Sequence, residues 1–207
     1  YSPDSHPEIF PSRDDELAYW INAYNAAAIK TVVTYYPIDS VLDVKNPAPL
    51  FFLTDKAGFF FFQRLTFGGA TTSLYYLENS VIRDRYKDPR IHFILNCASI
   101  GCPQLPRTAL TGEGLSEQLD FETRKFVSEE RNFFIDHDQQ TIFLSSIFKW
   151  YESDYLDSYK ERYPDSEPAL TDYIGLYLSR EQQLALDEVK DRYVVAFNTY
   201  DWGLNRQ

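Results

Sequence analysis

One long stretch, residues 13–35, carries the pattern that most constrains how this chain can fold. Apolar side chains recur at spacings of three and four along two neighbouring stripes, which is the period of an α-helix. Ser12 followed by Asp15 fits a helix start, and Pro37 sets the stop because helical geometry is disfavoured before a proline. A helix that is apolar nearly all round needs cover on most sides, so we expect it at the centre of the fold.

Shorter apolar patterns predict further helices and strands along the chain. Helices are expected where apolar residues recur at helical spacing, over residues 73–85, 113–126, 145–155, 170–178 and 181–189. Strands or hairpins are expected over residues 51–53, 59–67, 91–95, 133–144 and 192–198. The fold class is therefore α+β: a single helix-rich domain over residues 1–207, around a small mixed sheet that contains the 90–97 strand. Residues 1–11, which hold three prolines, are expected to form an extended arm.

Charge and composition exclude several classes of function. The formal net charge is −11 at pH 7, which argues against binding nucleic acid or an anionic membrane surface and indicates a soluble protein. No apolar run approaches the roughly 20 residues of a membrane-spanning helix. The chain is 44% hydrophobic and 17% aromatic, so it can bury a substantial core.

The chain begins at Tyr1 and contains no methionine. We interpret the start as a processed or trimmed N-terminus, and the expected compartment leans toward export or the cell envelope. The sequence makes no prediction of oligomeric state.

Chemistry-bearing residues concentrate between residues 88 and 103, which hold both cysteines and one of the three histidines. Cys97 and Cys102 are close enough to form a disulfide, a nucleophile beside a second thiol, or two inert buried thiols. A thiol nucleophile needs a base and a group that orients the base. His6 lies in the proline-rich arm and His137 at a hairpin tip, so His92 is the best candidate base by elimination.

The pairing of base and nucleophile stays open. On a strand, His92 points to one face and Cys97 to the other unless the chain bends there. Cys97 ranks narrowly above Cys102 as the nucleophile, and backbone N–H groups of the loop between them are candidates for an oxyanion hole. The candidates for the group that orients the base are Glu78, Asn22 and Asn25. Glu78 alternatively pairs with an arginine.

Several segments resemble the DUF547 family, a domain of unknown function. The strongest is Arg-Ile-His-Phe-Ile-Leu-Asn-Cys-Ala-Ser-Ile-Gly-Cys-Pro at residues 90–103. Further resemblances lie at residues 18–25, 73–83, 145–151 and 200–205, and together they cover nearly the whole chain. The resemblance implies a papain-like or transglutaminase-like cysteine site that acts on small thiol peptides such as glutathione. His92 precedes Cys97, which reverses the papain-like order, so a permuted arrangement would be required.

A small acidic peptide substrate would need cationic and aromatic partners. Candidate carboxylate partners are Arg83, Arg90 and Lys149. Trp150 and Tyr151 are candidates for a substrate groove, although aromatic residues at helical spacing more often belong to a core. Asn22 and Asn25 either contact substrate or tie down nearby loops through hydrogen bonds.

Metal and cofactor chemistry fit the sequence less well. His92, Cys97 and Cys102 could hold zinc, but zinc motifs pair their ligands at shorter spacing, so no metal is expected. No phosphate-binding glycine pattern is present, and no cofactor is expected. We therefore expect a cysteine-dependent hydrolase or acyl transferase acting on an amide or small thiol-peptide substrate. The alternative is a non-catalytic binding or scaffolding module with structural cysteines.

Overall fold

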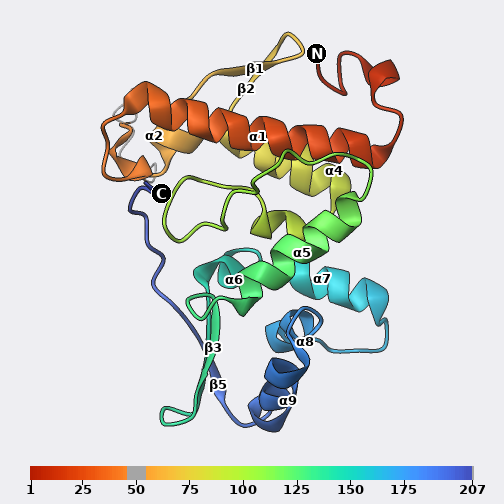
Figure 1. Cartoon of the computed structure of the whole chain (residues 1–207), viewed down its shortest axis with the longest axis vertical. Coiled ribbons are helices and arrows are strands. Elements are labelled where there is room, and N and C mark those ends of the chain that lie inside the picture. The colour runs from red at the N-terminus through yellow and green to blue at the C-terminus, as the bar shows by residue number, and fades with distance from the viewer. Residues whose placement is uncertain (46–54, 207) are drawn as a thin grey trace. The chain divides into compact units, whose positions relative to one another are not determined.

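The computed structural model describes residues 1–45 and 55–206 of the chain (Figure 1). These residues form helices and small sheets, which confirms the α+β class. Within them, no helix is long and apolar enough to cross a membrane. The chain divides into two compact units. The first comprises Tyr1–Tyr86, Phe93–Gln118 and Asp201–Gln207, and the second comprises Lys87–His92 and Leu119–Tyr200. The expectation of a single domain stays a prediction.

Helix α1, Arg13–Tyr35, runs through the first unit with the boundaries that the sequence predicts. The Ser12 hydroxyl accepts a hydrogen bond from the Asp15 backbone N–H at 3.1 Å, which satisfies one of the free donors at the helix start. Tyr24 and Ile21 on the predicted apolar stripe are buried. Val33, near the other end, is exposed, so α1 is not covered on all sides.

Short elements complete the first unit around α1. They are η1 (Pro7–Ile9), η2 (Val41–Asp43), α2 (Ala57–Phe60), β1 (Leu65–Phe67), β2 (Ala70–Thr72), α3 (Leu74–Tyr76), the π-helical segment η3 (Leu77–Arg83) and α4 (Asp84–Tyr86). The β1–β2 hairpin turns through Gly68 and Gly69, whose φ angles of 55° and 84° suit glycine. The predicted strand over 59–67 is wrong at its start, where Phe59 and Phe60 belong to α2. Residues 51–53 lie outside the described residues.

The arm at residues 1–11 is not fully extended. It turns at Ser2, whose carbonyl accepts the backbone N–H groups of Ser5 and His6, and then forms the 3-10 helix η1. Ser2 is buried. The prolines of this segment are therefore compatible with local turns, and the prediction of an extended arm is wrong.

The predicted strand at residues 90–97 does not form. Pro89–Phe93 is a 3-10 helix, η4, and a turn follows it. Ile91, Phe93 and Ile94 are buried, as the prediction required, but by a different backbone conformation. A short apolar run does not by itself distinguish a buried strand from a buried helical turn. The sheet therefore lacks the segment that was expected at its centre.

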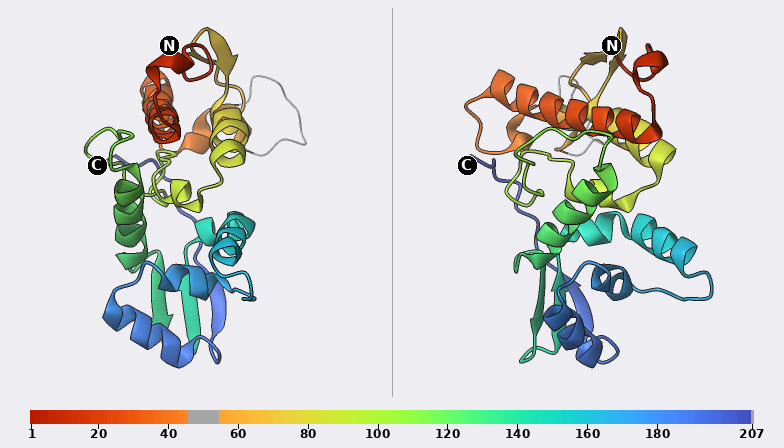
Figure 2. Two further views of the ribbon diagram at one scale, coloured as in Figure 1. Left: turned by 90° about the vertical axis from the view of Figure 1, so that its right-hand side faces the viewer. Right: turned by 45° about the vertical axis from the view of Figure 1, so that its right-hand side comes forward.

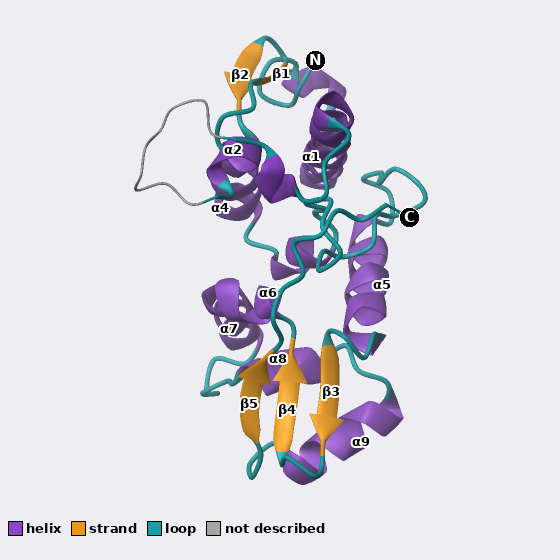
Figure 3. Cartoon of the chain, turned by 90° about the vertical axis from the view of Figure 1, so that its left-hand side faces the viewer, coloured by secondary structure: helices purple, strands orange, loops and turns teal. Residues whose placement is uncertain are grey.

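The second unit contains a three-stranded mixed sheet in the order β3-β4-β5 (Figure 3). Strands β3 (Phe133–Asp136) and β4 (Thr141–Leu144) form the predicted antiparallel hairpin, with His137 in its turn. Strand β5 (Val194–Phe197) pairs in parallel with β4.

In the described part of the chain, five α-helices belong to the second unit in whole or in part. They are α5 (Leu115–Ser128), which begins in the first unit, α6 (Ser146–Trp150), α7 (Glu152–Arg162), α8 (Leu170–Gly175) and α9 (Arg180–Val189). Helices α8 and α9 lie beside the sheet (Figure 2). The expected helix over 145–155 is broken at Tyr151.

Gly58 gives a test of packing in the first unit. A Cβ at this position would lie 1.7 Å from the backbone oxygen of Val44, so the chain must shift to admit it. We expect Gly58→Ala to lower the free energy of unfolding by roughly 2 kcal/mol, measured by urea denaturation. Gly175→Ala is the control, because a Cβ there meets no atom within 4 Å. Equal free energies of unfolding for Gly58→Ala and Gly175→Ala would contradict the close approach of Gly58 to the Val44 backbone.

Candidate functional site

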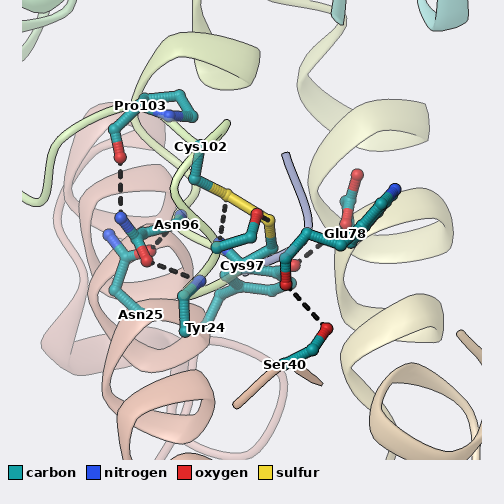
Figure 4. Close-up of a disulfide and its surroundings, with 11 residues drawn as sticks. Tyr24, Asn25, Ser40, Glu78, Asn96, Cys97, Cys102 and Pro103 are labelled. Atoms are coloured by element: carbon teal, nitrogen blue, oxygen red, sulfur yellow. Dashed lines mark hydrogen bonds between the residues drawn. A yellow bond between two sulfur atoms is a disulfide. The ribbon is translucent and has the colours of Figure 1, made fainter. Parts of the chain in front are cut away.

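Cys97 and Cys102 are joined in a disulfide bond within the first unit (Figure 4). They are the only two cysteines of the chain, so neither is a free thiol in this state. Cys97 is half-buried, whereas Cys102 is only 3% exposed. Of the three fates that the sequence left open, the structure contains the disulfide. Cys97 is therefore the more exposed of the two residues.

Asn96 closes the disulfide loop at both of its ends. Its side-chain oxygen accepts the Ala98 backbone N–H at 2.7 Å, and its side-chain nitrogen donates to the Pro103 carbonyl at 2.7 Å. Ala98 has a φ angle of 64°, a left-handed conformation that is costly for a residue with a Cβ. The hydrogen bonds on either side of Ala98 hold the loop in this conformation.

Asn25 of α1 holds the chain directly before the disulfide loop. Its amide nitrogen donates to the Ile94 carbonyl at 3.1 Å, and its oxygen accepts the Asn96 backbone N–H at 2.8 Å. Asn22, one turn earlier, makes the equivalent pair with the backbone of Leu110, at 2.8 and 2.9 Å. Both asparagines therefore tie loops to α1, which was one of their two predicted roles. Contact of either with substrate stays a prediction.

The end of the chain pairs with the same loop. The backbone N–H groups of Ile100 and Gly101 donate to the carbonyls of Gly203 and Asp201, at 2.8 and 2.9 Å. The N–H of Asn205 donates to the Ala98 carbonyl at 2.9 Å. With the Ala98 N–H bound to Asn96, most of the loop donors already have protein acceptors. The oxyanion hole that the sequence suggested in this loop stays a prediction.

Two donors face the sulfur atoms. The Ser99 hydroxyl lies 3.1 Å from Cys97 Sγ, and the Cys97 backbone N–H donates to Cys102 Sγ at 2.8 Å. Ser99 is completely buried. Hydrogen bonds to sulfur favour the thiolate over the thiol, so both sulfur atoms have a group that would stabilise them once the disulfide is reduced.

Glu78, a predicted orienting group, lies on the π-helical segment η3 near the disulfide (Figure 4). Its carboxylate accepts a hydrogen bond from the hydroxyl of Tyr24 on α1 at 3.1 Å. Extra-wide helical turns of this kind often occur at functional sites. The structure thus places a half-buried carboxylate and a tyrosine hydroxyl in the surroundings of the sulfur atoms.

His92 belongs to the second unit, where it has an acidic partner that the sequence did not predict. Its Nε2 lies 2.8 Å from Oδ2 of Asp154 in α7. The imidazole stacks on Tyr151 at 3.7 Å between ring centroids, and its side chain is 1% exposed. No local sequence pattern identifies Asp154 as the partner of His92, because the two residues are 62 positions apart in the chain. The base role of His92 toward Cys97, a residue of the first unit, stays a prediction.

Arg90 is engaged by carboxylates of the second unit. It forms ion pairs with Asp88 at 2.6 Å and with Asp120 at 2.8 Å. Burial lowers the pKa of Arg90, but hydrogen bonds and charge attraction from these two carboxylates outweigh it, and the net pKa lies above its ordinary value. These ion pairs give Arg90 a structural role; its predicted role in substrate binding stays a prediction.

The remaining predicted substrate residues are dispersed over both units. Arg83, in the first unit, donates to the Asn79 side chain at 2.6 Å. In the second unit, the Lys149 ammonium lies 5.6 Å from the centre of the Phe197 ring, and Trp150 packs on Tyr200. Tyr151 stacks on His92 as described above. Among residues 1–45 and 55–206, no group of three or more His, Cys, Asp or Glu side chains could hold a metal ion.

Comparison with known protein families gives a match over more than half of the chain. The profile of a family described as "Protein of unknown function, DUF547" matches residues 10–127. This range includes Asn25, Glu78, His92 and both cysteines, whereas Asp154 lies beyond it. No curated protein and no solved structure matches the chain, so the papain-like arrangement stays a prediction.

Proposed function

We propose that this chain, which belongs to the DUF547 family of proteins of unknown function, is a cysteine-dependent hydrolase or acyl transferase. Its nucleophile is Cys97, and its substrate is an amide or a small thiol peptide. The observation that carries the proposal is the asymmetry of the two sulfur atoms. Cys97 is half-buried and faces the Ser99 hydroxyl, whereas Cys102 is only 3% exposed and faces a backbone N–H.

The disulfide is the oxidised resting form in this proposal. A small thiol attacks Cys97 Sγ, the S–S bond breaks, and Cys102 leaves as a thiolate that keeps the hydrogen bond from the Cys97 N–H. A second thiol then attacks the mixed disulfide. Cys97 is released as a thiolate, and the two thiols leave as their own disulfide. Two electrons pass from the thiols to the protein.

The Cys97 thiolate then performs the transfer. It attacks the carbonyl carbon of the substrate, a C–S bond forms, and the C–N bond breaks as the leaving amine takes up a proton. Water or a second acceptor releases the acyl group. The Ser99 hydroxyl supports the thiolate, and the Glu78 carboxylate with the Tyr24 hydroxyl supplies proton-transfer groups in the surroundings.

The test is alkylation of the reduced protein by iodoacetamide across pH, with mass spectrometry to locate the label. We expect Cys97 to react about tenfold faster than Cys102 below pH 8, because each thiolate has one hydrogen-bond donor but Cys97 is the more exposed residue. Cys102→Ser should keep the reactivity of Cys97, whereas Ser99→Ala should lower it. If neither thiol reacts before the protein is denatured, the enzymatic proposal is wrong. Reactive protein is then assayed with γ-glutamyl amides and thioesters.

The alternative is a binding or scaffolding module with a structural disulfide. The observation in its favour is the number of hydrogen bonds that hold the loop from Asn25, from Asn96 and from the end of the chain. In that case the disulfide resists small thiols under native conditions. Cys102→Ser then lowers the free energy of unfolding by roughly 2 kcal/mol, the value expected for so short a loop, and changes no transfer reaction.

A further inference from the structure

The first unit contains a cavity of about 400 Å³ that neither cysteine lines. Its lining residues follow the end of α2 or belong to β2 and the start of α3, elements that are close together in the sequence. Its volume is within the range of small-molecule binding sites. We propose that this cavity binds a small ligand that carries one carboxylate or phosphate beside a flat apolar group. The proposal does not depend on the thiol chemistry.

The charge of the ligand follows from Arg64. It is the one charged residue among the described residues that line the cavity, and it is exposed. Two other arginines of the first unit have carboxylate partners: Arg85 pairs with Asp4, and Arg206 with Asp39. No described residue forms an ion pair with Arg64, although the chain carries a net charge of −11. A planar guanidinium left open at a cavity is suited to a bidentate carboxylate or phosphate.

Residues with hydroxyl groups line the same cavity as Arg64. The Ser73 oxygen accepts the Tyr76 backbone N–H at 3.3 Å, so the Ser73 hydroxyl proton can be donated to a ligand. Tyr76 also lines the cavity, is 54% exposed and carries a second hydroxyl. Neutral donors of this kind complement a cation in binding the several oxygens of one anionic group.

The apolar part of the ligand follows from Phe61 and Phe62. Phe61 is 41% exposed, and its ring stacks on Tyr75 at 4.0 Å between centroids and 20° between planes. The stacking fixes the orientation of the Phe61 ring without burying it. An exposed, oriented ring with a second phenylalanine beside it gives a flat apolar surface, which suits a ring or another planar group.

The segment that carries these groups is held in place before any ligand binds. Gln63 lies between Phe62 and Arg64, and its amide nitrogen donates to the Gly58 carbonyl at 2.7 Å. Its oxygen accepts the Tyr35 hydroxyl at 3.0 Å, which links the segment to α1. A preformed site lowers the conformational cost of binding.

The test is a titration of the oxidised protein followed by amide chemical shifts, with three probes of similar size: phenylacetate, phenyl phosphate and benzyl alcohol. We expect saturable shifts at residues 61–76 with the two anions and at least about fivefold weaker binding of the neutral alcohol. Preference for phenylacetate over phenyl phosphate, or the reverse, identifies the anionic group. Absence of saturable shifts in these residues with both anions overturns the proposal.

Variants separate the cation from the rest of the site. Arg64→Gln should weaken binding of the preferred anion about tenfold, since a charge-assisted hydrogen bond is lost. Arg107→Gln, another exposed arginine of the same unit, is the matched control and should bind like wild type. Tyr76→Phe should weaken binding by about threefold. Equal affinity of Arg64→Gln and wild type would show that no anion site exists here, whatever the stability of the variant.

Discussion

Replacing Asn25 with Leu is expected to lower the free energy of unfolding by roughly 4 kcal/mol. Asn25 is 7% exposed, and its amide is bound to the Ile94 carbonyl and the Asn96 N–H. Leu has a similar size, so little cavity forms, but two buried backbone groups lose their partner at about 1–3 kcal/mol each. Urea denaturation of the oxidised protein measures the loss. Hydrogen exchange at the Asn96 amide should accelerate in parallel, because its acceptor is gone.

Asn22→Leu is the matched control for this variant. Asn22 lies on the same helix and makes the same pair of hydrogen bonds, but with Leu110 and in a less buried place. We expect a smaller loss of stability and no change of exchange at Asn96. If Asn25→Leu lowers the free energy of unfolding by less than about 1 kcal/mol, α1 does not position the disulfide loop. The same conclusion follows if the Asn96 amide stays protected from hydrogen exchange in this variant.

His92→Ala should lower the free energy of unfolding by about 3–5 kcal/mol, the range for deleting a large buried ring. The imidazole is enclosed by Tyr151 and Tyr155, and only 1% of its side chain is exposed. Asp154 is 26% exposed, so water can hydrate its carboxylate once the imidazole is removed. We therefore expect lost packing to account for most of the decrease in the free energy of unfolding. Denaturation of His92→Ala, Asp154→Ala and the double variant measures the coupling between the two residues.

His92→Phe separates packing from proton transfer. A phenyl ring keeps the stacking on Tyr151 and loses the hydrogen bond to Asp154. We expect His92→Phe to recover most of the stability that His92→Ala loses. If His92 acts as the base for Cys97, alkylation of reduced Cys97 below pH 8 slows in the stable phenylalanine variant. Unchanged alkylation would assign His92 a structural role only.

The sequence determined the features that depend on neighbouring residues. Helix α1 has its predicted bounds because the cap at Ser12, the helical period and the proline that follows are all local signals. The β3–β4 hairpin and β5 were predicted for the same reason, since alternation and turn residues act over a few positions. The family also follows from contiguous motifs, above all residues 90–103.

The tertiary structure decided how the segment around Cys97 folds. Residues 90–97 were predicted as a strand, but the Ile94 and Asn96 backbone groups bind the side chain of Asn25 instead of a neighbouring strand. That partner lies about 70 residues away in the sequence, and no local period reveals it. The choice of a disulfide among three possible fates of the cysteines likewise depends on how the loop brings the two sulfur atoms together.

The same distinction holds for the candidate site residues. The sequence selected His92, Glu78 and Asn25 by residue type and position, but it did not identify their partners. Asp154 beside His92 and Tyr24 beside Glu78 come from segments 62 and 54 residues away. A hydrogen bond between distant side chains leaves no periodic trace in one sequence, because its geometry arises only when the elements pack. Local propensity thus fixed the helices and hairpins, and long-range hydrogen bonding decided which side chains meet.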